Sequence, residues 1–118
     1  GITYAHKLIK AEALIDWRQE ALAIERQVRA FNPWPVAETT LGAEKLRIWQ
    51  ALASDEPVQA APGTVLDADK CGIRVATGAG VLTLLSLQLP GGKPLPIAAI
   101  LNGRKDSFAP GTQLGTQA

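Results

Sequence analysis

The 118-residue sequence has little of what most protein chemistry requires: one histidine, one cysteine and no methionine. A single cysteine, Cys71, excludes an internal disulfide, and the chain has no second thiol or cluster of residues to hold a metal. The only histidine, His6, precedes the first expected helix, so no Ser-His-Asp or Cys-His arrangement can be assembled. We therefore predict no catalytic residue and no metal site in this chain, and an inert Cys71 that alkylating reagents would modify if it is exposed.

Long apolar runs are absent too. No stretch approaches the roughly 20 continuous apolar residues that span a bilayer, and charged residues interrupt the first sixteen positions, unlike a signal peptide. These absences predict a cytoplasmic protein with no membrane partner. The 12 basic and 11 acidic residues leave a net charge of +1, which is too balanced to argue for nucleic-acid binding from charge alone.

What is present is the composition of one small globular domain, with 47% hydrophobic and 19% charged residues. Because the chain has no methionine and begins with Gly1, we expect it to be a fragment of a longer protein. We expect an arm or linker at residues 1–16, a folded domain at 17–109 and a flexible tail at 110–118.

Apolar residues after the arm recur at helical spacing. Steps of four, three, four and three residues separate Trp17, Ala21, Ile24, Val28 and Phe31. This face predicts an amphipathic helix with Asp16 as its N-cap and Gln19 as the return partner, ending before Pro33. Together with Trp34, the aromatic residues of this region are expected to anchor the helix to the core.

Beyond residue 35 the pattern changes to period two, with glycine and proline between short apolar runs. Five strands are predicted, at residues 36–41, 45–51, 63–66, 72–77 and 81–89. The motif Gly78-Ala79-Gly80 indicates a hairpin turn, since no helix follows it as a phosphate-binding loop requires. A short helix is predicted at 96–102. Closure of five strands removes exposed edges, so we predict a mainly β fold: a small OB-like five-stranded barrel with an N-terminal amphipathic helix and a short C-terminal helix.

Basic side chains are the best candidates for a binding function. In the second predicted strand, Lys45, Arg47 and Trp49 occupy alternate positions, so two cations and one indole should project from one face. Cations neutralise phosphates, and an indole stacks on an exposed base. A Trp49 buried beneath the first helix is an equally open interpretation.

Two arginines of the predicted helix, Arg18 and Arg29, are separated by eleven residues, or about 16 Å along a helix axis. They could meet separated phosphates. Glu25 lies between them and can pair with Arg29, however, so an ordinary solvated face is the preferred interpretation.

Further basic residues lie toward both ends of the chain. Lys93, Arg104 and Lys105 form a third basic group, while Lys7 and Lys10 place two more cations in the arm. An extended basic arm can follow a phosphate backbone at low structural cost, although single lysines also serve solubility.

Several motifs carry a resemblance to a known family. They are Tyr4-Ala5-His6-Lys7, Ile15-Asp16-Trp17, Arg29-Ala30-Phe31-Asn32-Pro33-Trp34-Pro35, Pro62-Gly63-Thr64-Val65 and Leu101-Asn102-Gly103-Arg104. With these motifs, which cover nearly the whole chain, the sequence resembles the C-terminal domain of the methionyl-tRNA formyltransferases.

The resemblance implies an OB-like barrel that contacts initiator methionyl-tRNA. It also implies an N-terminal catalytic domain, absent from this sequence, that binds formyltetrahydrofolate as co-substrate; this fragment alone should be inactive and hold no cofactor. By position, the resemblance makes Lys7 and Lys10 candidates for tRNA contacts of the linker, and Lys45 and Arg47 for those of the barrel. The family's barrel is expected to carry a positive channel, and this nearly neutral chain departs from that pattern.

Two functions therefore stay open. The first is a tRNA-binding domain that positions initiator methionyl-tRNA for formylation. Its predicted contact residues are Lys7, Lys10, Arg18, Arg29, Lys45, Arg47, Lys93, Arg104 and Lys105. The alternative is a structural domain that braces a folate-dependent formyltransferase or hydrolase catalytic domain without appreciable nucleic-acid binding, as the near-zero net charge favours.

Overall fold

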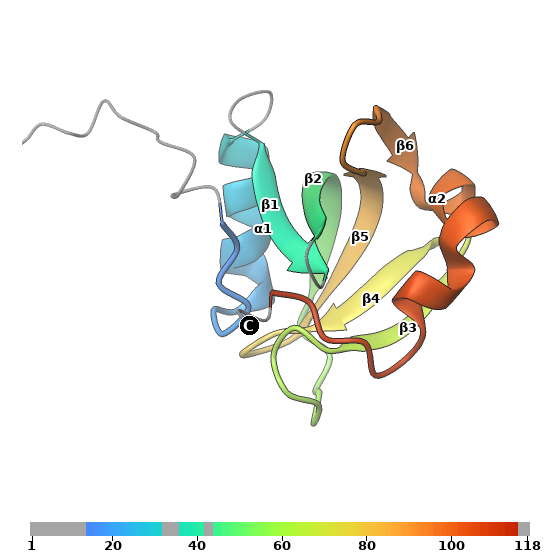
Figure 1. Ribbon diagram of the computed structural model, residues 1–118. Helices are drawn as coiled ribbons and strands as arrows, with labels where there is room; N and C mark the ends of the chain where they lie inside the picture. The colour runs from blue at the N-terminus through green and yellow to red at the C-terminus, as the bar shows by residue number, and fades with distance from the viewer. Residues whose placement is uncertain (1–13, 32–35, 42–43, 116–118) are drawn as a thin grey trace, which may run out of the picture.

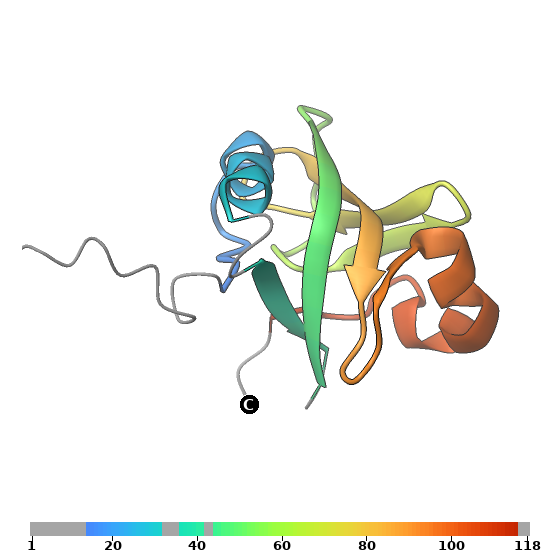
Figure 2. The same ribbon diagram turned by 90° about the horizontal axis from the view of Figure 1, so that it is seen from above.

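The computed structural model describes residues 14–31, 36–41 and 44–115. Five of its strands form an antiparallel path in the order β1-β2-β5-β4-β3, and β6 adds to β5. One helix lies beside β1 and β2, and the other lies on the opposite side of the sheet (Figures 1 and 2). The elements are α1 (Ala21–Ala30), β1 (Ala37–Leu41), β2 (Glu44–Ser54), β3 (Val65–Asp69), β4 (Gly72–Ala76), β5 (Val81–Gln88), β6 (Pro94–Pro96), α2 (Ile97–Arg104) and the 3-10 helix η3 (Lys105–Phe108).

Alternate residues of the central strands line the core. Leu46 and Ile48 of β2 and Leu82 and Leu84 of β5 are fully buried, as period-two patterning predicts. Buried residues of the helical segments join the same cluster: Ile24, Val28, Ile97, Ile100 and Phe108. Among the described residues, no helix has the length and apolar character that a membrane crossing requires.

Helix α1 begins later than the apolar spacing predicts. Its first residue is Ala21, and Glu20 before it makes no side-chain capping bond. The predicted N-cap is therefore wrong: Asp16 instead closes a turn, in which its Oδ1 accepts a hydrogen bond of 3.0 Å from the backbone N–H of Arg18. Trp17, taken as the first position of the helical face, is buried within this turn.

The hairpin between β4 and β5 explains the delayed start. The backbone N–H of Gly78 donates to the carbonyls of Trp17 and Gln19 at 2.9 and 3.0 Å, so the hairpin engages carbonyls that a helix starting at residue 17 would use internally. A Cβ at Gly78 would overlap the backbone carbonyl of Arg18, and Gly80 has a φ of +88°. The predicted hairpin is confirmed. Gly78 is required because the backbone of Arg18 approaches it closely, and Gly80 because its φ is positive.

The mainly β class, the N-terminal helix and the short C-terminal helix are confirmed. The sheet has six strands, however, and the predicted five-stranded closure is not formed, because β1 and β3, the two ends of the strand path, do not pair with each other. The missed strand, β6, begins and ends with proline, which argues against a strand in sequence but is tolerated at an edge. The predicted end of α1 at Pro33 falls outside the described residues, as does Trp34; the helix itself ends at Ala30.

The C-terminal segment covers the gap between the two edges. The backbone N–H of Val65 donates to Thr112 at 2.7 Å, and that of Gly115 donates to Thr40 of β1 at 2.8 Å. Leu114, between them, is 1% exposed. Residues 111–115 thus make backbone contacts with residues 63–65 and β1, and residues 116–118 of the predicted tail lie outside the described residues.

Candidate nucleic-acid interface

The outer face of β2 presents the cations that the alternating pattern indicates. Leu46 and Ile48 point into the core, so Lys45 and Arg47 lie on the opposite face. A change of register against β5 follows Ile48. Trp49 is half-buried at this irregularity.

Strand pairing gives Arg47 two polar neighbours from other strands. It lies opposite Glu38 of β1 and Gln88 of β5. These three residues and Lys45 line a cavity of about 220 Å³, which the turn after β5 closes with residues 89–91. The cavity thus brings two cations, one carboxylate and one amide to a single place on the outer face.

Trp49 connects this cavity to helix α1. Its indole N–H donates to Gln88 Oε1 at 2.9 Å, and the Gln88 amide nitrogen donates to the carbonyl of Gly92, also at 2.9 Å. Trp49 also lines a second cavity, of about 620 Å³, with Val28 and Arg29 of α1. The indole is therefore neither fully buried beneath the helix nor fully projecting.

We call Arg29, Lys45, Arg47 and Trp49 the basic strip. Arg29 reaches it from α1 with a side chain that is 68% exposed. Its predicted partner, Glu25, is present, but the Nη2 to Oε2 distance of 3.9 Å makes this a loose, solvent-screened pair. The guanidinium is thus still accessible beside Trp49.

Arg18 does not belong to the strip. It lies in the turn before α1, so the predicted helix flank shared with Arg29 does not exist. Its side chain is 84% exposed, and its Nε lies 3.0 Å from Asp16 Oδ1. Hydrogen bonds from the side chain and the backbone N–H of Arg18 lower the pKa of Asp16, and the same carboxylate raises the pKa of Arg18.

The remaining predicted contacts are spread over the molecule. Lys93 is exposed in the turn between β5 and β6, two residues beyond the lining of the smaller cavity. Arg104 and Lys105 lie where α2 meets η3, across the sheet from α1 (Figure 1). Lys7 and Lys10 lie outside the described residues.

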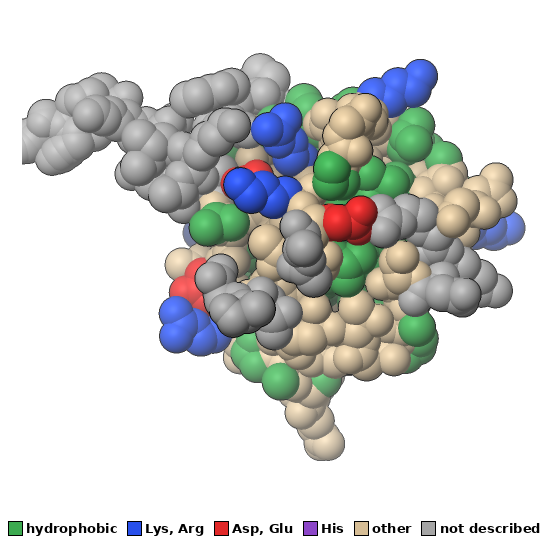
Figure 3. Space-filling model, in the orientation of Figure 1, with side chains coloured by type: hydrophobic (Ala, Val, Ile, Leu, Met, Phe, Trp, Pro, Cys, Tyr) green, Lys and Arg blue, Asp and Glu red, His purple; other side chains and the backbone are tan. Residues whose placement is uncertain are grey.

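Figure 3 shows the basic side chains of one face as separate groups, with acidic, apolar and uncharged surface between them. A continuous positive channel is not visible on this face. This agrees with the near-neutral net charge of +1.

Sequence reasoning missed Glu38 and Gln88, because their place beside Arg47 depends on strand register. Alternation within β1 alone indicates only that Glu38 is on the outer face, and the core-facing Ala37 beside it supports that. Cys71 is exposed in the turn between β3 and β4, where its backbone N–H donates to Asp69 Oδ1 at 2.8 Å. Within the described ranges, no group of three or more His, Cys, Asp or Glu residues is placed to hold a metal ion.

Comparisons with known proteins bear on this surface. The family model described as "Formyl transferase, C-terminal domain" matches residues 7–105. A curated methionyl-tRNA formyltransferase of Stutzerimonas stutzeri is 50% identical over 113 residues, which is 96% of this chain and 35% of that protein. The chain thus spans about a third of the length of this relative.

Solved structures show the same fold. HypX from Aquifex aeolicus in complex with tetrahydrofolic acid matches with a TM-score of 0.66 at 21% identity, over 80% of this chain and 17% of that one. A variant of HypX matches with a TM-score of 0.68 at 20% identity, over 88% of this chain and 19% of that one. At these identities the likeness establishes the fold alone. The resemblance drawn from the sequence motifs is confirmed by the family match and the 50% identical relative.

Proposed function

The chain belongs to the family of formyl transferase C-terminal domains, and from this premise we propose that it is the tRNA-binding domain of a methionyl-tRNA formyltransferase. In this proposal it binds initiator methionyl-tRNA and helps place the methionyl amino group in an N-terminal catalytic domain of the same protein. That domain transfers the formyl group from formyltetrahydrofolate. The present chain contributes position and no catalytic group, and the whole enzyme works in the cytoplasm.

The observation that carries the proposal is the 50% identity to a methionyl-tRNA formyltransferase over nearly the whole chain. The basic strip supplies a physical means. Lys45 and Arg47 project from the outer face of β2, and Arg29 adds a third cation on the other side of Trp49. Cations of this kind neutralise phosphates, which fixes the register of an RNA on a protein surface without reading its sequence.

The test is a titration of fluorescently labelled initiator tRNA with the 118-residue chain at low and moderate salt. Neutralised phosphates release counterions, so affinity should fall as salt rises. The variant with Lys45→Glu and Arg47→Glu should bind about ten- to a hundredfold more weakly at low salt, because two attractive contacts become repulsive.

The single variants Lys45→Glu and Arg47→Glu each have a matched control in Lys70→Glu. Lys70 is exposed in the turn between β3 and β4, so its reversal changes the net charge equally without touching the basic strip. Equal losses for Lys70→Glu and Arg47→Glu would reduce the effect to net charge and contradict a binding role for the strip. Absence of binding even at low salt would contradict tRNA binding by this chain altogether.

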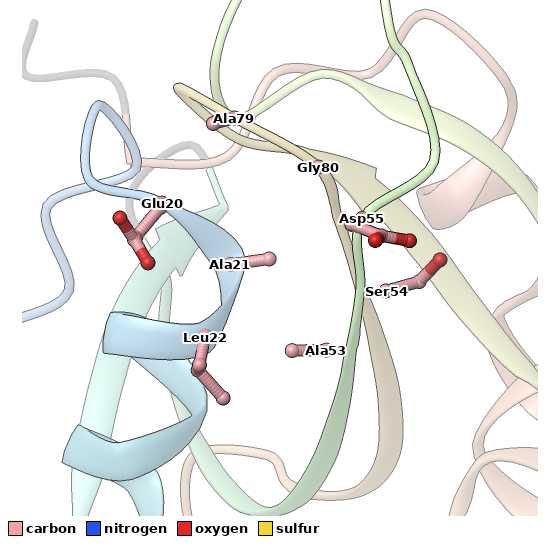
Figure 4. Close-up of a pocket in the computed structure, with 8 residues that line it drawn as sticks. All are labelled: Glu20, Ala21, Leu22, Ala53, Ser54, Asp55, Ala79 and Gly80. Atoms are coloured by element: carbon pink, nitrogen blue, oxygen red, sulfur yellow. The ribbon is translucent and has the colours of Figure 1, made fainter.

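A second candidate function is a brace for the catalytic domain, and exposed apolar side chains favour it. Leu22 of α1 and Leu52 of β2 are 40% and 55% exposed. Between these elements lies a cavity of about 340 Å³, in which Ala21 and Ala53 point toward each other (Figure 4). If the exposed leucines beside this groove dock the catalytic domain, Leu22→Asp with Leu52→Asp should weaken association with the separately produced catalytic domain and leave salt-dependent tRNA affinity unchanged.

A further inference from the structure

An acidic side chain, Glu38, lies beside the basic strip and has no side-chain partner in the part of the chain that the structure describes. Glu38 is 7% exposed and stands opposite Arg47 in the pairing of β1 with β2. Among the described residues, neither Arg47 nor any other side chain forms an ion pair or hydrogen bond with its carboxylate. A largely buried carboxylate without protein donors keeps only part of its hydration, so a ligand that donates to it would be favoured.

Glu38 borders the smaller cavity. In the described part of the chain, no fully buried side-chain oxygen or nitrogen lacks a partner. Because the Glu38 carboxylate has no partner among the described residues, its oxygens are not fully buried, and Glu38 is one of the residues that line the cavity. The free acceptors of Glu38 and the donors of Lys45 and Arg47 therefore share one cavity.

The other polar side chain of the cavity, Gln88, already makes two hydrogen bonds within the protein. Gln88 accepts from Trp49 through Oε1 and donates to Gly92 through its amide nitrogen. These two hydrogen bonds hold the Gln88 amide in place between the cavity and the indole of Trp49. A ligand that fills the cavity must therefore satisfy a carboxylate and two cations together.

Few chemical groups do so. A phosphate would satisfy Lys45 and Arg47 but be repelled by Glu38, and an arginine or lysine of a protein partner would satisfy Glu38 but be repelled by the two cations. Guanine presents both kinds of atom: its N1–H and N2–H donate, and its O6 and N7 accept. Adenine also has a donor, N6–H, and an acceptor, N7, but its N1 is an acceptor, so it gives the carboxylate one hydrogen bond where guanine gives two. The two donors and two acceptors of guanine therefore favour it over adenine.

We propose that this cavity reads one unpaired guanine of the bound tRNA. Glu38 accepts hydrogen bonds from N1 and N2, while Arg47 or Lys45 donates to O6 and N7. The inference rests on the proposed tRNA-binding function and adds base recognition to phosphate positioning. A volume of about 220 Å³ lies below the roughly 300–1,000 Å³ of pockets for drug-sized ligands, as suits a single base.

The test compares binding of the 118-residue chain to labelled pentaribonucleotides that differ only in the central base: UUGUU, UUAUU and the inosine form, which lacks the N2 amino group. The wild type should bind UUGUU at least about fivefold more tightly than UUAUU, the lower end for one bidentate base contact. The inosine form should fall between them, because it keeps N1–H and O6.

The variant Glu38→Gln should change RNA affinity in opposite directions for the two roles that Glu38 can have. If the carboxylate only repels phosphates, its neutralisation should raise affinity for every RNA. If it binds guanine, the variant should lose affinity for UUGUU until the guanine preference disappears. The melting temperature should not fall, because the change keeps the shape and removes a buried unpaired charge. The control Glu20→Gln, at an exposed acid before α1, should keep the preference.

The outcomes separate this inference from the proposed function. Salt-dependent tRNA binding without a guanine preference, or with affinity raised uniformly by Glu38→Gln, overturns the guanine site and leaves tRNA positioning intact. A guanine preference that Glu38→Gln abolishes supports the site, even if tRNA itself fails to bind and the proposed function fails. If Glu38→Gln leaves all RNA affinities unchanged but weakens association with the catalytic domain, the carboxylate belongs to a protein contact and the inference is overturned.

Discussion

Two outward-facing arginines of neighbouring regions have opposite surroundings. Arg74 of β4 is held between two carboxylates, with Nη2 2.6 Å from Glu56 Oε1 and Nη1 2.7 Å from Asp67 Oδ2. Arg47 of β2 stands opposite Glu38, yet no ion pair forms between them. The carboxylates around β3 and β4 thus satisfy Arg74, whereas Arg47 and Glu38 lie beside a cavity without pairing with each other.

In this nearly neutral protein, ion pairing distinguishes charges that hold the fold together from charges that are accessible to a ligand. Glu56 first and Asp67 next raise the pKa of Arg74, so this guanidinium is committed to its own domain. Among the described residues, the cations of the basic strip form no ion pair except the loose pair of Arg29 with Glu25. Net charge conceals this contrast, because paired and unpaired cations count equally.

The largest expected effect is a loss of stability on truncating a buried side chain next to β3. Leu114 is fully buried in the segment that covers the gap between β3 and β1, so Leu114→Ala should lower the free energy of unfolding by about 2–5 kcal/mol. Urea unfolding followed by tryptophan fluorescence measures it. The control Leu52→Ala, at a side chain 55% exposed, should cost far less. Equal costs for the two variants would contradict an ordered role for residues 110–115.

The next largest effect is on tRNA affinity, and it compares an arginine of the basic strip with one outside it. Arg29→Glu should weaken tRNA binding about three- to tenfold at low salt, because one contact with phosphate becomes repulsive. Arg18→Glu should have a smaller effect, since Arg18 lies outside the basic strip and is paired with Asp16. Titration of labelled tRNA with both variants measures the difference. A larger loss for Arg18→Glu would move the interface to the turn before α1.

A smaller effect is expected at Arg74. Its two ion pairs are more than a third exposed, so Arg74→Ala should change the free energy of unfolding by no more than about 1 kcal/mol. Its effect on tRNA affinity should match that of Lys70→Ala, which removes a charge from the adjoining turn. A much larger loss of affinity than for Lys70→Ala would show that the paired arginine also contacts RNA.

Local patterns predict the parts of this fold that depend on neighbouring residues. Alternation identifies the buried and outer faces of β2 up to Trp49, and glycines at positions 78 and 80 identify the hairpin. Both depend on a few consecutive residues. The same local reasoning identifies Lys45 and Arg47 as outward cations.

Features that local patterns fail to predict depend on contacts between residues far apart in the sequence. Asp16 is a good N-cap by residue type, but the hairpin at Gly78 takes the carbonyls that follow it. Residues 110–115 have little apolar character except Leu114, and their order comes from backbone hydrogen bonds to Gly63, Val65 and β1. Glu38 enters the candidate site only through the register of β1 with β2.

The smallest effect concerns the exposed pair before α1. Hydrogen bonds from Arg18 lower the pKa of Asp16 below its ordinary value of 3.8, so the pair stabilises the fold above that pH and loses its contribution as pH falls through the lowered pKa. Asp16→Asn should therefore be slightly less stable than the wild type at pH 7, and the difference should vanish at pH values below the lowered pKa. Urea unfolding at a series of pH values measures it, with Asp55→Asn as a control at an exposed acid that has no ion pair among the described residues. A difference that persists unchanged into acid would mean that the Asp16 side chain supports the turn through its shape and not through its charge.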